Sequence, residues 1–393
     1  MKRQAERFGV VVGVLALGGV AFVASGVNPS TFWPFAAPSP TPDEEPSFQT
    51  GNLESVYFNE RELADLELAD RVDPSNVRYW TGLDRDAFSP GCAAKDCILS
   101  IDKPSFVSVA EAESWLGDGH RVISVTDGES ARAYPFGILN YHEVVNDQID
   151  GTPIAVTYCP LCRSALVFAR PTHGSKLLEF GVAGRLYQDN LILYDRQTGT
   201  YWSQLQARPI VGPLVGSGLT LRRRPLDVMK WADWRAQYPD GRVLARPTDG
   251  DALGGQESYT RPTVPTGMAR GRPSGSSGSF LFDYRTDPYA SYAADPSARG
   301  GDFDDSRLRP KAEVIGIELN EASAAVPQSR LSPGQSLQLQ VAGRTITIRQ
   351  DEQGRIQASV SKDGQQRELP VVTAYWFAWL SFHPDTLLYE DGS

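Results

Sequence analysis

Two cysteines, Cys159 and Cys162, carry the chemistry that the sequence indicates most strongly. Thiols three residues apart can hold one metal ion between them or close into a disulfide with each other. They are two of only four cysteines in the 393-residue chain, and they lie between two apolar, β-rich runs where a plain core would use valine or alanine. The pair therefore predicts where a functional site lies, without specifying its reaction.

Two thiolates leave a metal coordination shell incomplete, and the chain has four histidines that can contribute to it. His142 and His383 lie in aromatic and apolar surroundings, whereas the other two lie beside glycines in predicted turns. We therefore expect the ligands Cys159, Cys162, His142 and His383. Sulfur and imidazole ligands suit copper or zinc and disfavour magnesium and calcium, whose sites are built from oxygen.

A thiol-disulfide oxidoreductase is the competing interpretation, because two cysteines with a proline between them also have a redox spacing. Thioredoxin-type pairs open a helix whose N-terminus lowers the pKa of the attacking thiol, whereas residues 163–168 have the composition of a strand. A third interpretation is a non-catalytic structural or interaction module with an inert cysteine pair. Whether the protein is an enzyme stays open on these residues.

Several cofactors have no motif in the chain. Arg163 follows Cys162 where covalent attachment of haem c requires histidine. Nucleotide and flavin motifs are absent from the sequence as well. The net charge of −10 argues against a nucleic-acid partner, for which a basic face is expected.

The N-terminus has the composition of a membrane-entering leader. Residues 1–7 carry three basic side chains and one acidic one, and residues 8–27 form an uncharged apolar stretch long enough to cross a bilayer core of about 30 Å. We interpret residues 1–27 as a cleaved signal peptide or a retained transmembrane anchor. Basic residues before the stretch predict that the rest of the chain is extracytoplasmic, in the periplasm or at the cell surface.

The remaining chain divides by composition. Residues 28–50 are proline-rich and predict an extended linker, and residues 51–393 have enough apolar side chains for a single globular domain. Within that domain, residues 248–279 are rich in Gly, Ser and Pro and predict a mobile loop. Cys92 and Cys97 are close enough in sequence to form a disulfide in an oxidising compartment.

Short β-branched or aromatic runs separated by turn residues predict a mainly β, α+β domain with antiparallel-rich sheets and a few short helices. The expected helices are 54–72, 111–116 and 227–237. The expected strands are 121–125, 131–134, 154–158, 165–169, 177–182, 191–194, 313–319, 336–341, 344–350 and 356–361.

Several separate motifs appear in a characteristic order, in the stretches 131–135, 142–147, 156–162, 195–199, 202–204 and 382–385. With these stretches the chain resembles the bacterial and archaeal family called domain of unknown function 3179. The resemblance implies an exported or membrane-anchored protein and carries no established reaction. The family pattern contains the positions of His142, Cys159 and Cys162, whereas the Cys92 and Cys97 pair lies outside it.

Overall fold

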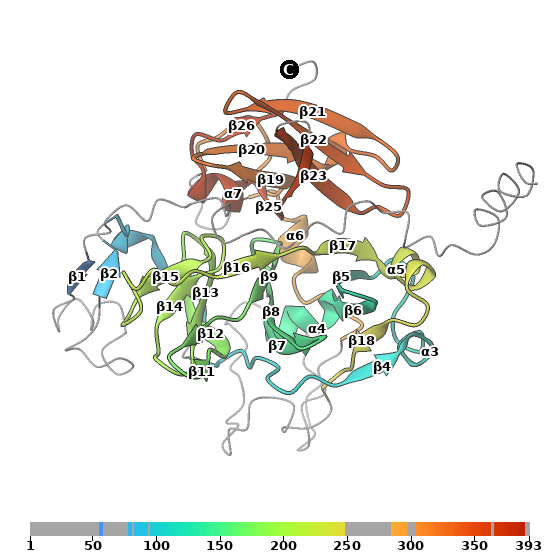
Figure 1. Cartoon of the computed structure of the whole chain (residues 1–393), viewed down its shortest axis with the longest axis horizontal. Coiled ribbons are helices and arrows are strands. Elements are labelled where there is room, and N and C mark those ends of the chain that lie inside the picture. Colours follow the sequence, from blue (N-terminus) through green and yellow to red (C-terminus); the bar gives the residue numbers. More distant parts are fainter. Residues whose placement is uncertain are drawn as a thin grey trace, which may run out of the picture. The chain divides into compact units, whose positions relative to one another are not determined.

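The computed structural model describes residues 55–57, 78–80, 82–92, 95–247, 284–297, 303–362 and 365–389. Strands dominate these residues, most of them paired in antiparallel sheets, and the helices are short (Figure 1). The predicted α+β, mainly β fold is therefore confirmed. The predicted leader, linker and mobile loop lie outside the described residues. No helix in the described ranges combines the length and apolar composition of a membrane span.

The first large sheet has seven strands. They are β1 (Ser55–Tyr57), β2 (Arg78–Trp80), β3 (Phe88–Pro90), β12 (Phe180–Tyr187), β13 (Asn190–Asp195), β14 (Tyr201–Ser203) and β15 (Arg208–Val211), and their order is β1-β2-β15-β14-β13-β12-β3. Gln188 and Asp189 alone connect β12 to β13, with φ of 50° and 59°. Two-residue hairpins favour this left-handed geometry because it matches the twist of the flanking strands.

The second large sheet contains the strands on either side of the cysteine pair. Its members are β7 (Val144–Ile149), β8 (Thr152–Cys159), β9 (Ser164–Ala169), β16 (Arg222–Arg224), β19 (Glu313–Leu319), β20 (Ala322–Pro327), β25 (Val371–Tyr375) and β26 (Leu387–Leu388). Seven of them follow the order β26-β20-β19-β25-β9-β8-β7, and β16 pairs with β9. The sheet thus joins strands from the middle and the end of the chain.

The third sheet has five strands in the order β17-β5-β6-β18-β4. These are β4 (Phe106–Ser108), β5 (Arg121–Asp127), β6 (Ser130–Pro135), β17 (Asp227–Lys230) and β18 (Arg242–Leu244). Two smaller sheets complete the strands of the described residues. One contains β10 (Thr172–His173) and β11 (Lys176–Leu177), and the other contains β21 (Ser336–Val341), β22 (Arg344–Gln350), β23 (Ile356–Lys362) and β24 (Gln365–Leu369).

The described α-helices are one or two turns long. They are α3 (Val109–Ala112), α4 (Phe136–His142), α5 (Trp231–Gln237), α6 (Ala290–Ala294) and α7 (Trp376–Phe382). Two 3-10 turns, η4 (Arg85–Ala87) and η6 (Gln328–Arg330), accompany them. Helices this short are stabilised by tertiary packing of their apolar side chains more than by intrinsic propensity.

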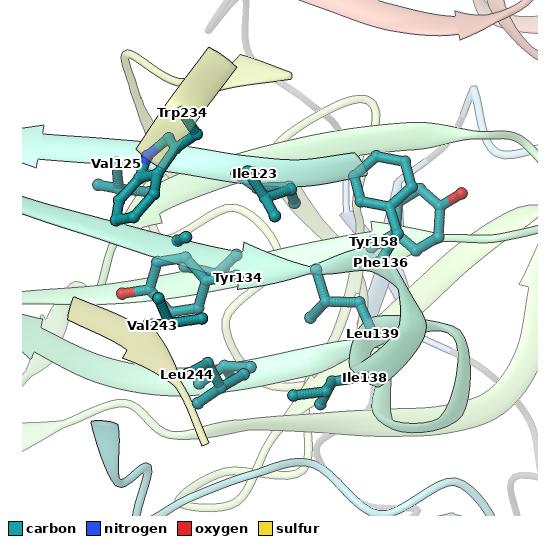
Figure 2. Packing of buried hydrophobic residues seen from close by; sticks show 14 of the residues in the cluster. Ile123, Val125, Tyr134, Phe136, Ile138, Leu139, Tyr158, Trp234, Val243 and Leu244 are labelled. Atoms are coloured by element: carbon teal, nitrogen blue, oxygen red, sulfur yellow. The ribbon is translucent and has the colours of Figure 1, made fainter. Parts of the chain in front are cut away.

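One hydrophobic cluster fixes the position of α4. It combines side chains of the five-stranded sheet with those of α4, α5 and β8, and Figure 2 shows part of it. Phe136 at the start of α4 packs on Tyr158 of β8, with ring centroids 4.4 Å apart. The C-terminal end of α4 lies beside the end of β8, because the backbone N–H of Tyr158 donates to the carbonyl oxygen of Glu143, directly after the helix.

A second cluster contains the cysteine pair itself. Cys159 and Cys162 pack there with large side chains that include Phe168 of β9, Trp202 of β14 and Trp379 of α7. The two thiols therefore lie in the apolar interior of the domain, among residues of both large sheets.

The predicted strands agree with the structure except for 177–182, which divides between β11 and β12 because residues 178 and 179 belong to neither strand, and the predicted helices need correction. Residues 313–319, 336–341 and 344–350 form β19, β21 and β22 as predicted. The helix predicted over 227–237 begins only at Trp231, because residues 227–230 pair with β5 as β17. The helix predicted over 111–116 is instead Val109–Ala112: it begins earlier because Ser108 and Glu111 form a capping box, and residues 113–115 form a turn.

The helix predicted over 54–72 is wrong at its beginning. Ser55–Tyr57 forms β1 and pairs with β2 in antiparallel register. The rest of that prediction lies outside the described residues. Local helix propensity thus gives way to pairing with a strand that lies beyond the predicted helix in sequence.

Gly316 provides a test of the packing that holds α7 on the sheet. A Cβ atom at this position of β19 would lie 2.3 Å from the indole ring of Trp379. We expect Gly316→Ala to lower the free energy of unfolding by about 1–3 kcal/mol, because overpacking forces the ring or the strand to move. Denaturant unfolding measures the change. Gly119→Ala is the control, because a Cβ there meets no atom within 4 Å; equal stability of both variants would contradict the packing.

Candidate functional site

The β8–β9 hairpin brings the two cysteines together. Cys159 pairs with Ser164 across the hairpin, and residues 160–163 form the connecting turn. Arg163 closes the turn in the left-handed region, with φ of 53°. Neither cysteine belongs to a disulfide, and the two residues are only 2% and 0% exposed. The sequence spacing and this turn together produce the tight thiol pair that the sequence predicts.

Cys162 contacts the seven-stranded sheet directly. Its Sγ donates a hydrogen bond to the carbonyl oxygen of Asp189, in the β12–β13 turn, at 3.0 Å. Burial raises the pKa of the Cys162 thiol well above its usual value, and a hydrogen bond with Cys159 raises it further, although a hydrogen bond with Asn190 opposes the shift. Without a cation nearby, this thiol therefore keeps its proton.

A buried polar network supports the hairpin from the same side. Gln204 accepts hydrogen bonds from Ser164 Oγ at 2.8 Å and from Asn190 Nδ2 at 3.0 Å. Its own Nε2 donates to Thr157 Oγ1 at 2.9 Å. Each side chain is at most 1% exposed, so each needs these partners to avoid the cost of unsatisfied burial. The network fixes the strands that carry the thiols.

Glu143 is a site residue that the sequence analysis missed. It ends α4 in the left-handed region, with φ of 56°, and its carbonyl accepts a hydrogen bond from the backbone N–H of Tyr158 at 2.8 Å. Only 8% of the residue is exposed. Burial raises the pKa of its carboxyl group well above the usual value, and the charge of the nearby Cys159 thiolate raises it further.

The carboxyl group of Glu143 differs from the side chains of the Gln204 network in its contacts. Within the described part of the chain, no hydrogen bond or ion pair reaches its oxygens. A buried carboxylate in this state is costly, and strongly perturbed acids of this kind concentrate at functional sites. The available sequence signal was its position directly after His142 in the stretch 142–147.

His142 lies next to Glu143 in the chain, but its ring forms hydrogen bonds with residues other than the cysteines. Its Nδ1 donates to the carbonyl oxygen of Leu99, and its Nε2 accepts from the hydroxyl group of Tyr284, both at 2.9 Å. Burial lowers its pKa to about 4, although the hydrogen bond to Leu99 opposes the shift. The ring is therefore neutral at physiological pH and uses both nitrogens to join separate segments.

His383 belongs to a separate charge cluster at the end of α7. Its Nε2 lies 3.2 Å from Glu318 Oε1, and its ring stacks on Trp379 with centroids 3.9 Å apart. Arg223 forms a two-pronged ion pair with the same carboxylate, at 2.9 and 3.2 Å. Burial alone would raise the pKa of Glu318, but Arg223 and His383 outweigh it and lower the pKa to about 2.

The structure thus brings Cys159 and Cys162 together and does not bring His142 or His383 to them. Among the described residues, no group of three or more His, Cys, Asp or Glu side chains is arranged to hold a metal ion. Each histidine is held by its own partners, which is the physical reason for the separation. The residue that approaches the thiols from the segment of His142 is Glu143.

Cys92 and Cys97 form a disulfide, with Cα atoms 6.2 Å apart, in agreement with the sequence prediction. The loop between them contains Asp96, whose carboxylate pairs with Arg196 at 2.7 Å. Arg196 also contacts Asp102 at 3.1 Å. The disulfide therefore closes the loop that contributes Asp96 to the ion pairs of Arg196, the residue directly after β13, and it does not involve Cys159 or Cys162.

The cluster around Glu318 predicts a measurable dependence of stability on pH. Because its folded pKa is below the ordinary value of 4.5, its contribution is complete above pH 4.5 and is lost as the pH falls toward 2. We expect Glu318→Gln to lower the free energy of unfolding by about 3 kcal/mol at pH 7, and by less as the solution is acidified. Denaturant unfolding from pH 2 to 7 checks this, with the exposed Glu129→Gln as control. A difference that stays constant with pH would contradict the assignment.

Comparison with known proteins gives one family match. No curated protein and no solved structure shows significant similarity to the chain. The model of the family described as "Protein of unknown function (DUF3179)" matches residues 95–386, which include the cysteine pair, Glu143 and both site histidines. The chain therefore belongs to the DUF3179 family.

Proposed function

We propose that the protein binds a thiophilic metal ion, copper or zinc, through the thiolates of Cys159 and Cys162, and that the Glu143 carboxylate moves in as a further ligand when the metal binds, since the three side chains are not arranged around a metal position in this structure. Its role is then the handling of that metal or a metal-dependent step outside the cytoplasm. The observation that carries the proposal is a pair of buried thiols outside any disulfide, next to a buried carboxyl group whose pKa is raised by burial and by Cys159.

The backbone supports this proposal. A hairpin turn closed by a left-handed residue directs two thiols to one point and resembles the knuckles that present cysteine pairs to zinc. Sulfur ligands favour copper and zinc, and a carboxylate oxygen is an established zinc ligand. Bound metal would require the Cys162 thiol to lose its proton and its hydrogen bond to Asp189.

Charge balance supports it as well. Burial keeps Cys162 and Glu143 protonated while no cation is present, so two thiolates and a carboxylate can form among these buried residues only with a cation to compensate their three negative charges. Arg163, the nearest cation in sequence, is directed to Glu313 at 2.8 Å and to Tyr375. A bound cation would compensate the charges that no described side chain compensates.

The histidines have positioning roles in this proposal. His142 holds the segment that precedes Glu143, and His383 stabilises Glu318, so neither ring is required as a ligand. This differs from the ligand set expected from the sequence.

Metal content tests the proposal. We expect near-stoichiometric copper or zinc in protein isolated from its native compartment, and almost none in Cys159→Ser or Cys162→Ser. Glu143→Gln should keep the fold and weaken metal affinity at least tenfold, because one ligand is lost. A tenfold loss of affinity equals ~1.4 kcal/mol of binding free energy. Elemental analysis and competition with a chelator measure both effects.

The matched control is Glu113→Gln, whose side chain is 48% exposed and pairs with Arg235. It should bind metal like the wild type. Absence of metal from the wild-type protein, or full retention of metal after loss of either cysteine, would refute the proposal.

Thiol-disulfide exchange is the second candidate, supported by the hydrogen bond between the two thiols. It requires an accessible thiolate of low pKa, whereas Cys162 is fully buried and its pKa is raised. Alkylation of the reduced protein as a function of pH separates the candidates: a thiol that reacts well below pH 8 would favour exchange. An inert pair without metal would favour the third candidate, a non-catalytic interaction module.

The extracytoplasmic location is part of the proposal and rests on the composition of residues 1–27. An exported protein is consistent with the disulfide between Cys92 and Cys97, since such bonds persist in oxidising compartments. Fractionation of cells that express the full chain tests the location. Recovery of all the protein in the cytoplasm would exclude it.

A further inference from the structure

One short segment lies against the cysteine site from outside the sheets. This segment, residues 284–297, is called the strap below, and it includes α6. Its N-terminal half contacts α4: Tyr284 donates its hydroxyl hydrogen to His142 Nε2 at 2.9 Å, and Asp287 accepts from Asn140 Nδ2 at 3.1 Å. The strap is thereby attached to the helix that ends at Glu143.

The second half of the strap contacts the hairpin turn. Tyr292 donates its hydroxyl hydrogen to the carbonyl oxygen of Leu161, between the two cysteines, at 3.0 Å. Tyr289 is 8% exposed, and its hydroxyl group is close enough to Glu143 and Cys159 to feel the charge of both. The strap therefore spans the site from the end of α4 to the turn that carries the thiols.

The strap differs from the strands around it because none of its residues belongs to a described sheet. Within the described ranges, its backbone hydrogen bonds are local, such as those from Ala290 to Asp287 and from Ala293 to Tyr289. Side chains make its other described attachments, including Lys311, whose Nζ donates to the carbonyl oxygens of Tyr292 and Asp295. Segments without sheet pairing open at a lower free energy than the core does.

Gly137 shows how closely the strap approaches α4. A Cβ atom at this helical position would lie 2.1 Å from the carbonyl oxygen of Tyr284. Alanine would otherwise favour the helix, so glycine here is explained by the passage of the strap backbone. A single methyl group at Gly137 would therefore push the strap away without disturbing any strand pairing.

We propose that the strap is a cover over the dithiol, latched by the hydrogen bond between His142 and Tyr284, and that its opening controls access to Cys159 and Cys162. His142 is then a positioning residue. This deepens the proposed function, because a metal ion would enter by the same opening. The cover itself is testable by thiol reactivity alone.

Thiol alkylation under native conditions tests the cover. The probe is a small maleimide, which labels only Cys159 and Cys162 while the Cys92–Cys97 disulfide is intact. When closing is faster than labelling, the rate reports the population of the open state. We expect slow labelling of the wild type, and labelling at least tenfold faster in Gly137→Ala and severalfold faster in Tyr284→Phe and Tyr292→Phe.

Matched controls separate strap opening from general destabilisation. Gly119→Ala and Tyr238→Phe make the same chemical changes away from the strap and should label like the wild type. If Gly137→Ala does not fold, the two tyrosine variants decide the outcome. Denaturant unfolding of every variant gives its global stability for comparison.

Two results would overturn the cover. One is rapid labelling of the wild type at the rate of a free thiol. The other is labelling of the strap variants that matches the wild type or rises only in proportion to lost global stability. Metal analysis is separate: a wild type without metal but with strap-controlled labelling would refute the metal proposal and leave the cover intact.

Discussion

The contact between two hairpin turns is the interaction on which the site depends. The β8–β9 turn carries Cys162, and its thiol donates to the carbonyl oxygen of Asp189 in the β12–β13 turn. Both turns use left-handed residues, Arg163 in one and the pair at 188–189 in the other. Because each turn closes a hairpin of a different large sheet, this contact locates the thiols where the two sheets meet.

Four buried polar side chains around the thiols follow the rule that buried polar groups need partners. Thr157, Ser164, Asn190 and Gln204 satisfy one another. Glu143 has no such partner in the described residues, although it is nearly as buried. A fold that keeps a costly carboxylate beside two thiols loses stability there, and a bound cation offers a physical reason for keeping it.

The sequence around the two histidines is compatible with two roles, as metal ligands and as buried rings held by hydrogen bonds. His142 and His383 lie among apolar and aromatic residues, which is expected of a metal ligand and equally of a buried ring held by hydrogen bonds. The structure gives each ring its own partners: Leu99 and Tyr284 for His142, Glu318 and Trp379 for His383. His142 thereby links the segment that ends at Glu143 to the strap, and its contribution to the site is to position these two segments.

The sequence by itself determined the features that depend on neighbours in the chain. Short β-branched or aromatic runs between turn residues predicted β19, β21 and β22, and short spacings predicted both the Cys92–Cys97 disulfide and the proximity of Cys159 to Cys162. Tertiary structure decided the rest. Residues 227–230 became a strand because β5 offered an edge for pairing, which no local pattern records.

Tertiary contacts also explain why Glu143, and not the adjacent His142, lies beside the thiols. The left-handed backbone at Glu143 turns the chain at the end of α4, so two adjacent side chains reach different surroundings. Which of them faces the thiols depends on how Phe136 packs on Tyr158 and on how the strap crosses the helix. These contacts join segments far apart in sequence, and their energies exist only once the sheets have assembled.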